Sequence, residues 1–134
     1  MSASSSRSPL TVLFVDPDRR RSELLVEAIR ATSSVGMAPS AKQAMDALLS
    51  QPPDLMVTEL DLPDARGVDF IRRIHSDPRT KDVLIMVVTS HASVRDKIAA
   101  LLAGADDFLV RPVSPEQFTI KVRLLGRFRR IVGR

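Results

Sequence analysis

The sequence predicts a doubly wound α/β domain, in which a parallel sheet of five strands carries helices on both faces. Strand-like and helix-like segments alternate along the chain, and two strand segments, residues 55–58 and 82–89, are apolar almost throughout. Uninterrupted apolar strands are typical of a parallel sheet that is buried on both faces. Regular alternation favours right-handed crossovers, which place helices on both sides of the sheet. A flavodoxin-like topology satisfies these observations.

Ten segments make up this pattern, five of each kind. The strand segments are apolar and often β-branched, and they cover residues 10–15, 35–38, 55–58, 82–89 and 107–110. The helix segments repeat apolar residues at helical spacing; the first begins near Arg19, three more cover 41–49, 68–75 and 93–103, and the last begins at 114–116. The apolar residues at helical spacing are Leu24, Leu25, Ala28 and Ile29 in the first helix, and Phe118, Val122, Leu125 and Phe128 lie on one side of the last helix. In the second helix we expect Ala44, Ala47 and Leu48 to face inward. The run 82–89 is the most hydrophobic and should be a central strand, whereas 35–38 has the weakest strand pattern.

Length and composition indicate one globular domain. The chain has 134 residues, of which 44% are hydrophobic and 27% charged, so a single hydrophobic core can form. It has no cysteine, and therefore neither a disulfide framework nor a thiolate metal site, and no apolar run approaches the length of a membrane span. We expect a cytoplasmic protein with a disordered Ser-rich tail at 1–8, a domain at 9–130 and a short C-terminal end at 131–134.

Charged and hydroxyl side chains follow the strand segments and predict a polar site at one edge of the sheet. These residues are Asp16 and Asp18 after the first strand, Glu59 and Asp61 after the third, Thr89 at the end of the fourth and Arg111 after the fifth. In open α/β sheets, ligands bind at the C-terminal ends of the strands. A buried carboxylate there needs a cation or hydrogen-bond donors nearby. Ordinary structural roles are the alternative, such as helix capping by Asp16 and Asp18.

Several motifs resemble the receiver domain of two-component response regulators, over nearly the whole chain after the tail. They are Val12–Asp16, Pro53–Leu55 ahead of Glu59, Leu62-Pro63 with Gly67, Val88–Ser90 and Ala103–Pro112. In that family an aspartate after the third strand accepts a phosphoryl group from a histidine kinase, using Mg²⁺ held by an acidic pair after the first strand. The resemblance places the acceptor position at Glu59, the hydroxyl and basic positions at Thr89 and Arg111, and the switch aromatic at Phe108. In activated members the hydroxyl bonds toward the acceptor and the aromatic turns inward.

Three positions depart from the family pattern. The acceptor is Glu59 instead of aspartate, Pro17 replaces the second acidic residue, and Arg111 replaces the usual lysine. A longer carboxylate side chain displaces the nucleophile from its in-line geometry, and proline cannot ligate Mg²⁺. We therefore expect either no cofactor or a weakly bound Mg²⁺ on Asp16, Glu59 and Asp61. We also expect an ion pair between Glu59 and Arg111, because a planar guanidinium matches a carboxylate.

These departures predict a pseudo-receiver, a domain that keeps the family's fold and surface but acts as a protein interaction module and not as an enzyme. Glu59 would then imitate the phosphorylated state by placing negative charge near Thr89 and Arg111. Three alternatives stay open. Glu59 can instead hold an inactive-like shape, the domain can still be phosphorylated with weak Mg²⁺ binding, or it can be a flavodoxin-like domain that binds a small molecule.

The resemblance and the charge distribution also predict partners. The family implies a histidine kinase or another signalling protein, and a homodimer through the fourth helix, fifth strand and fifth helix. This face offers both signs of charge for pairing across a two-fold axis, at Arg95, Lys97, Asp106, Asp107, Lys121 and Arg123. Basic residues line the last helix, but the chain has no Trp or Tyr on which bases could stack. We therefore expect neither a nucleic-acid nor a membrane partner for this domain alone.

Overall fold

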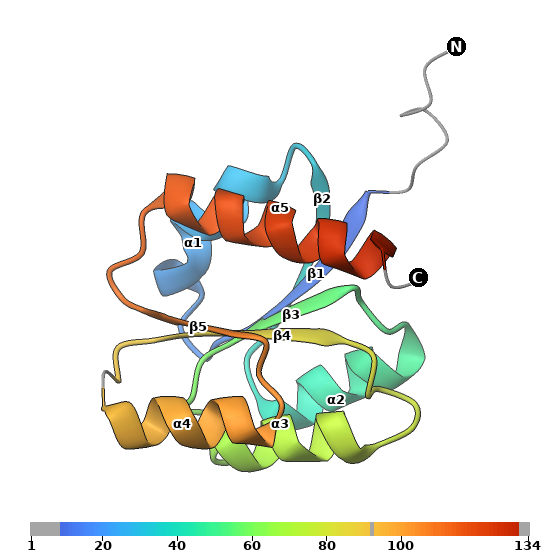
Figure 1. The fold of residues 1–134 in the computed structure, drawn as a ribbon, viewed down its shortest axis with the longest axis vertical. Coiled ribbons are helices and arrows are strands. Elements are labelled where there is room, and N and C mark those ends of the chain that lie inside the picture. The colour runs from blue at the N-terminus through green and yellow to red at the C-terminus, as the bar shows by residue number, and fades with distance from the viewer. Residues whose placement is uncertain (1–8, 92, 132–134) are drawn as a thin grey trace.

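Five strands alternate with five helices in the computed structural model, which describes residues 9–91 and 93–131 (Figure 1). The strands are β1 (Leu10–Val15), β2 (Ser33–Ala38), β3 (Leu55–Thr58), β4 (Leu84–Thr89) and β5 (Asp107–Val110). The helices are α1 (Arg19–Ile29), α2 (Ala41–Ser50), α3 (Gly67–Ser76), α4 (Val94–Ala103) and α5 (Pro115–Ile131). The expected tail at 1–8, and residues 132–134 of the expected C-terminal end, lie outside the described residues.

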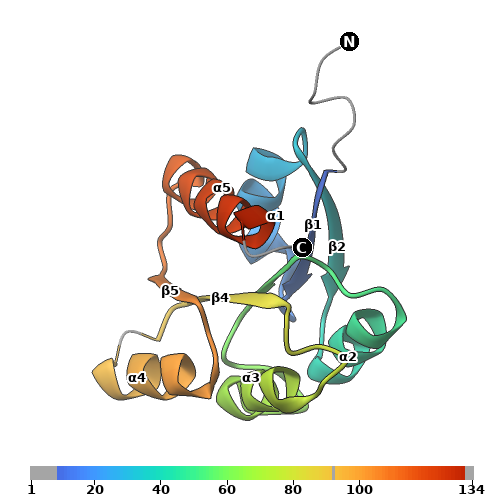
Figure 2. The same ribbon diagram turned by 45° about the vertical axis from the view of Figure 1, so that its right-hand side comes forward.

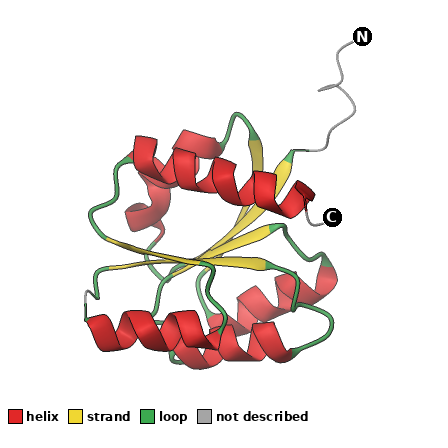
Figure 3. Ribbon diagram, in the orientation of Figure 1, coloured by secondary structure: helices red, strands yellow, loops and turns green. Residues whose placement is uncertain are grey.

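The strands form one parallel sheet in the order β2-β1-β3-β4-β5. Helices α1 and α5 lie on one face of this sheet, and α2, α3 and α4 lie on the other (Figures 1 and 2). The two helical layers with the sheet between them are clearest when the chain is coloured by secondary structure (Figure 3). This arrangement confirms the predicted flavodoxin-like, doubly wound fold. Within the described part of the chain, no helix is both long enough and apolar enough to cross a bilayer.

Each face of the sheet has its own hydrophobic core. The central strands β3 and β4 are buried along their whole length, and their side chains alternate between the two cores. Met56 and Ile85 point toward the layer of α2, α3 and α4, whereas Val57 and Met86 point toward α1 and α5. Burial on both faces explains why these segments contain no regular polar alternation.

Two residues of the apolar patterns in the first and last helices lie at the surface. Leu24 is 72% exposed and Phe128 is 50% exposed. The buried stripe of α1 runs through Ser22, Leu25, Val26 and Ile29. Ser22 takes an inward position because its hydroxyl donates a hydrogen bond to the carboxylate of Asp16, at 3.3 Å. Leu24 therefore lies beside that stripe, and Phe128 lies beside the stripe of α5 that begins at the buried Phe118.

Two strands begin at residues other than the expected ones. β2 begins at Ser33 instead of residue 35, because Ser33 already pairs in register with Leu10 of β1. β4 begins at Leu84 instead of residue 82, because the preceding turn continues through Val83, whose N–H donates to Thr80 O at 3.1 Å.

The first residue of α3 lies closely against the start of the loop that follows β3. The N–H of Gly67 donates to Leu60 O at 2.8 Å, and a Cβ atom at Gly67 would lie 2.6 Å from Leu60 Cα. Glycine permits this approach because it has no Cβ. Asp61 and Arg66 form an isolated antiparallel bridge within the same loop. The loop therefore closes on itself immediately after Glu59.

Candidate functional site

The residues that the sequence places after strands meet at one edge of the sheet. Asp16 follows β1, Glu59 follows β3, Thr89 ends β4 and Arg111 follows β5. These four strands are consecutive neighbours in the parallel sheet, so their C-terminal ends share one edge. Asp16 and Glu59 are almost completely buried, at 4% and 3% exposure, and Thr89 is fully buried. The site is therefore a closed polar pocket.

Glu59 points into this pocket, where it accepts two hydrogen bonds and faces two guanidinium groups. Its Oε2 atom accepts a hydrogen bond from the backbone N–H of Leu60, at 2.7 Å, and another from the hydroxyl of Thr89. Its Oε1 atom lies 3.9 Å from Nη2 of Arg21 and 3.9 Å from Nε of Arg111. A buried carboxylate requires such donors and cations, and here the surrounding residues supply both.

Asp16 is the centre of the hydrogen-bond network. Its Oδ1 atom accepts from Nη2 of Arg21, at 2.6 Å, and from the backbone N–H of Asp18, at 2.8 Å. Its Oδ2 atom accepts from Nη2 of Arg111, at 3.2 Å, and from the hydroxyl of Ser22, at 3.3 Å. Both oxygens of Asp16 are thus engaged by donors from α1 and from the loop after β5.

Arg111 has a different main partner from the expected one. It donates to Asp16 through Nη2 and to the backbone carbonyl of Arg21 through Nη1, at 3.1 Å. Its contact with Glu59 is the longer one, and Nε, which faces Glu59, is a buried nitrogen without a hydrogen-bond partner among the described residues. Arg111 therefore connects the β5 end to the beginning of α1, and Glu59 is a secondary partner.

Asp18, which we grouped with the acidic pocket, directs its carboxylate elsewhere. It is the N-cap residue of α1, and its Oδ1 atom accepts from the backbone N–H of Arg20 at 3.0 Å. A side chain that satisfies the first turn of a helix cannot also point into the pocket. Its contribution to the pocket is the backbone N–H that Asp16 binds.

The other acidic residues of the β3–α3 loop also lie away from the pocket. Asp61 is exposed and pairs with His91, with Oδ2 and Nε2 separated by 2.5 Å, and this contact raises the pKa of His91. The carboxylate of Asp64 accepts from the backbone N–H groups of Lys42 and Ala41, both at 2.9 Å, and these bonds lower the pKa of Asp64. Asp16 and Glu59 are thus the two carboxylates of the predicted set that meet.

Thr89 and Phe108, which we expected to be the switch positions, are both turned inward. Thr89 binds Glu59 through its hydroxyl, as described above, and Phe108 is buried in the core beneath α2, α3 and α4. Phe108 is the register partner of Val87 in β4. Val87 lies two residues before Thr89 in the same strand. The hydroxyl and the aromatic ring therefore take inward positions on neighbouring strands.

The expected dimer face is only partly available for contacts between molecules. Arg95 and Lys97 on α4, and Arg123 on α5, are exposed. Asp107, however, pairs with Lys121 within the chain at 3.2 Å, and Asp106 accepts from the backbone N–H of Ile85 at 2.8 Å. Burial raises the pKa of Asp106. The acidic members of this face already have partners inside the domain.

Sequence reasoning did not identify Arg21 as a pocket residue. Arg21 is the third of three consecutive arginines, and nothing in that run distinguishes it from its neighbours. Asp18 caps α1, so Arg21 lies in the first turn of that helix, where side chains lean toward the N-terminal end and here reach the end of β1. The expected helix start near Arg19 already contained the signal, because it places Arg21 in the first turn, close to the end of β1.

Apolar side chains on the outer side of α4 were also missed. Leu102 is 83% exposed, and Val94, Ile98 and Leu101 are exposed as well, while the inward positions of this helix are filled by Ala100 and Ala103. The buried stripe of α4 is filled by alanine, so it has no room for the helix's larger apolar side chains, and some of these must face solvent. This excess was visible in the sequence.

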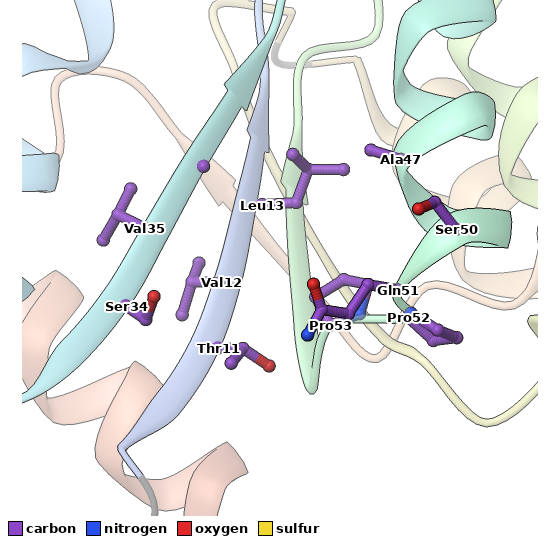
Figure 4. A pocket seen from close by; sticks show the side chains of 11 residues that line it. Thr11, Val12, Leu13, Ser34, Val35, Ala47, Ser50, Gln51, Pro52 and Pro53 are labelled. Carbon is purple, nitrogen blue, oxygen red and sulfur yellow. The ribbon is translucent and has the colours of Figure 1, made fainter.

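A separate hollow of about 410 Å³ lies at the opposite end of the sheet, near the beginnings of β1 and β3 (Figure 4). Leu13 faces Ala47 of α2 across it, and Gln51 and Pro53 close one end. The residues that line it are apolar or uncharged, so it offers no ionic anchor for a charged ligand. It is distant along the strands from the acidic pocket, which lies at their C-terminal ends.

Fold and pocket together define a single-sheet α/β domain that gathers buried acidic, hydroxyl and basic groups where its strands end. The model of the response regulator receiver domain family matches residues 12–123, and the chain belongs to this family. It is 33% identical over 120 residues to the probable transcriptional regulatory protein TcrX of Mycobacterium tuberculosis, covering 89% of this chain and 50% of that protein. The chain spans about half the length of the curated relatives that it matches.

Solved structures agree with this assignment. A response-regulator structure from Chloroflexus aurantiacus is 30% identical, with a TM-score of 0.83 over 88% of this chain and 98% of that chain. A CheY-like receiver domain from Methanospirillum hungatei has a TM-score of 0.87 at 22% identity, over 94% of this chain and 100% of that chain, and shares the fold. The resemblance that the sequence motifs indicated is confirmed.

The arrangement of the pocket does not fit the Mg²⁺ ion that the family uses. Mg²⁺ requires near-ideal octahedral ligation by oxygen atoms. Residues 9–91 and 93–131 contain no group of three or more His, Cys, Asp or Glu side chains placed to hold a metal. Both oxygens of Asp16 already bind donors, the next residue is Pro17, and the Asp61 carboxylate goes to His91. The weak Mg²⁺ site expected from Asp16, Glu59 and Asp61 therefore lacks a coordinating set.

Proposed function

We propose that this receiver domain is a pseudo-receiver, a constitutive protein interaction module of two-component signalling in which Glu59 stands in for a phosphorylated aspartate. The observation that carries the proposal is the bond from the Thr89 hydroxyl to Glu59, together with the burial of Phe108. These are the inward positions that activated members of the family adopt. They are present here without a phosphoryl group.

The charge distribution gives a physical reason for this state. A carboxylate at the end of β3 offers a negative charge to the hydroxyl and to the cations of the neighbouring strand ends. Glu59 uses one oxygen for Thr89 and the Leu60 backbone, and turns the other toward Arg21 and Arg111. The longer glutamate side chain thus meets the groups that would otherwise bind a phosphoryl oxygen.

The α4 side of the domain has an exposed surface that a partner protein could bind. Ile98 and Leu102 are large, apolar and exposed on α4, and Val110 is exposed at the end of β5, the strand that also carries Phe108. Exposed apolar side chains that cluster on one face mark interaction sites. We place there a histidine kinase, another signalling protein or a second copy of the chain, bound in the cytoplasm, with a homodimer using α4, β5 and α5.

Phosphorylation by a small phosphodonor tests the proposal. Three proteins are incubated with acetyl phosphate and Mg²⁺, and their intact masses are then measured: wild type, Glu59→Asp, and the triple variant Pro17→Asp, Glu59→Asp, Arg111→Lys. Wild type should remain unmodified, because its nucleophile is misplaced and it lacks an Mg²⁺ ligand. Glu59→Asp alone should also fail, because it leaves the other two changes in place.

The triple variant serves as the positive control and should gain the mass of one phosphoryl group. Its modification shows that the fold supports the chemistry once the family residues are restored. Phosphoryl transfer to the wild-type protein, at Glu59 or elsewhere in the pocket, would overturn the proposal.

A further inference from the structure

We propose that Arg21 is the resident cation of the acidic pocket, where its guanidinium joins Asp16 to Glu59 and makes the inward arrangement of the switch independent of divalent metal. The inference rests on the proposed function, since it states what keeps the pseudo-receiver in that arrangement. Its physical basis is one nitrogen atom: Nη2 of Arg21 lies 2.6 Å from Asp16 Oδ1 and 3.9 Å from Glu59 Oε1. A single positive centre thus faces both buried carboxylates.

Arg21 is held in this place by its backbone as well as by its side chain. Its N–H donates to the carbonyl of Asp18 at 3.2 Å, in the turn that begins α1. Its own carbonyl accepts from Nη1 of Arg111 at 3.1 Å. The first turn of α1 and the loop after β5 therefore both fix the backbone of Arg21, from which the guanidinium reaches Asp16, so the contact is built into the fold. The hydrogen bond to Asp16 raises the pKa of Arg21 further, so it stays charged.

Charge balance explains why a divalent ion would not share the pocket. The carboxylates of Asp16 and Glu59 face the guanidiniums of Arg21 and Arg111, so the charges of these four side chains cancel. The carboxylate of Asp18 also acts on Arg21, but from an exposed position outside the pocket. Adding Mg²⁺ would leave an excess of positive charge next to buried groups, which is strongly unfavourable. A metal ion could therefore enter the wild-type pocket only if an arginine left; the triple variant differs because Pro17→Asp adds a third carboxylate.

Relative exposure identifies which arginine would leave. The side chain of Arg21 is 37% exposed, whereas that of Arg111 is 16% exposed. Removing Arg21 opens a path from solvent to Asp16 and Glu59 without disturbing the contact between Arg111 and Asp16. The structure thus assigns to Arg21 a positioning role that also excludes metal.

A paramagnetic ion provides a direct test. Isotope-labelled protein is titrated with Mn²⁺, and the broadening of backbone amide signals is followed by NMR. In wild type, we expect no selective broadening near Asp16 and Glu59. In Arg21→Ala and Arg21→Gln, amides next to those two residues should broaden selectively, and excess Mg²⁺ should reverse the effect.

Thermal unfolding supplies a second measurement. Arg21→Ala should lower the unfolding midpoint by roughly 5–10 °C, because two buried carboxylates then share one cation. Added Mg²⁺ should recover part of this loss in the variant and leave wild type unchanged. Arg20→Ala is the matched control, since Arg20 is the exposed neighbour in the same helical turn and should behave as wild type does in both experiments.

The outcomes separate this inference from the proposed function. Selective Mn²⁺ broadening in wild type equal to that in Arg21→Ala would overturn the role of Arg21, even if acetyl phosphate still failed to modify the protein. Variants that neither bind Mn²⁺ nor lose stability relative to Arg20→Ala would overturn it too. The same holds if both Arg21 variants fail to fold and Mn²⁺ does not restore folding. Phosphorylation of wild type would instead remove the proposed function itself.

Discussion

Replacing Thr89 with valine tests the bond on which the inward arrangement depends. Valine keeps the shape of threonine but lacks the hydroxyl that donates to Glu59 in the buried pocket. A hydrogen bond to a charged group contributes roughly 1.5–3 kcal/mol, about twice the contribution of a neutral one. Glu59 keeps its bond from the Leu60 N–H. We therefore expect the free energy of unfolding to fall by about 2 kcal/mol.

Thr80 provides a matched control for this substitution. It is as deeply buried as Thr89, but its hydroxyl donates to a neutral acceptor, the carbonyl of Ile74, at 2.8 Å. Urea denaturation of Thr80→Val should show a loss of about 1 kcal/mol. A double-mutant cycle of Thr89→Val with Glu59→Gln isolates the charged part of the bond and should give a coupling of about 1 kcal/mol. Equal losses for the two threonine variants, with no coupling to Glu59, would refute the reasoning.

Three further results are expected. Gly67→Ala places a Cβ atom 2.6 Å from the backbone of the β3–α3 loop and should lower the free energy of unfolding by about 2 kcal/mol in the same urea assay. Asp61 raises the pKa of His91. The ion pair therefore stabilises the fold below the ordinary histidine pKa, and this stabilisation is lost as the pH rises through the raised pKa. Asp61→Asn should return the His91 pKa, measured by NMR, to its ordinary range. If the domain dimerises through α4, Leu102→Glu should shift it to monomer in sedimentation, whereas Leu24→Glu, at a comparably exposed position on α1, should not.

Each of these expectations has a contrary result. An unchanged unfolding curve for Gly67→Ala would mean that Gly67 is not packed against the backbone of Leu60. A His91 pKa that is the same with and without Asp61 would remove their ion pair. If Leu102→Glu on α4 and Leu24→Glu on α1 affected dimerisation equally, α4 would not form the dimer interface.

The fold could be predicted from the sequence because the apolar strand segments and the alternation of strands with helices indicate the same architecture. The apolar runs of β3 and β4 indicated strands buried on both faces, and alternation with helices indicated a parallel sheet. The buried positions on the helices were harder to predict. Leu24 and Phe128 are apolar and lie next to the buried stripes, yet both are exposed. Side-chain direction at the border of a stripe depends on how the helix rotates against the sheet, which local pattern does not determine.

The sequence predicted which residues form the candidate site, but not which of them form hydrogen bonds and ion pairs with one another. Strand ends in a parallel sheet must meet, so Asp16, Glu59, Thr89 and Arg111 could be assembled from topology alone. Which of the carboxylates pairs with which cation depends on side-chain geometry in loops. Arg111 therefore binds Asp16 more closely than Glu59, and Asp18 turns to cap α1.

The balanced pocket has a consequence for how this sequence can change over generations. Asp16 and Glu59 share Arg21 and Arg111, so replacing any one of the four leaves an uncompensated charge in a buried place. A return to ordinary phosphotransfer would pass through such intermediates unless several positions changed together. Among descendants and relatives that carry glutamate at the acceptor position, residues corresponding to Arg21 and Arg111 should therefore covary with it and be lost or gained as a set.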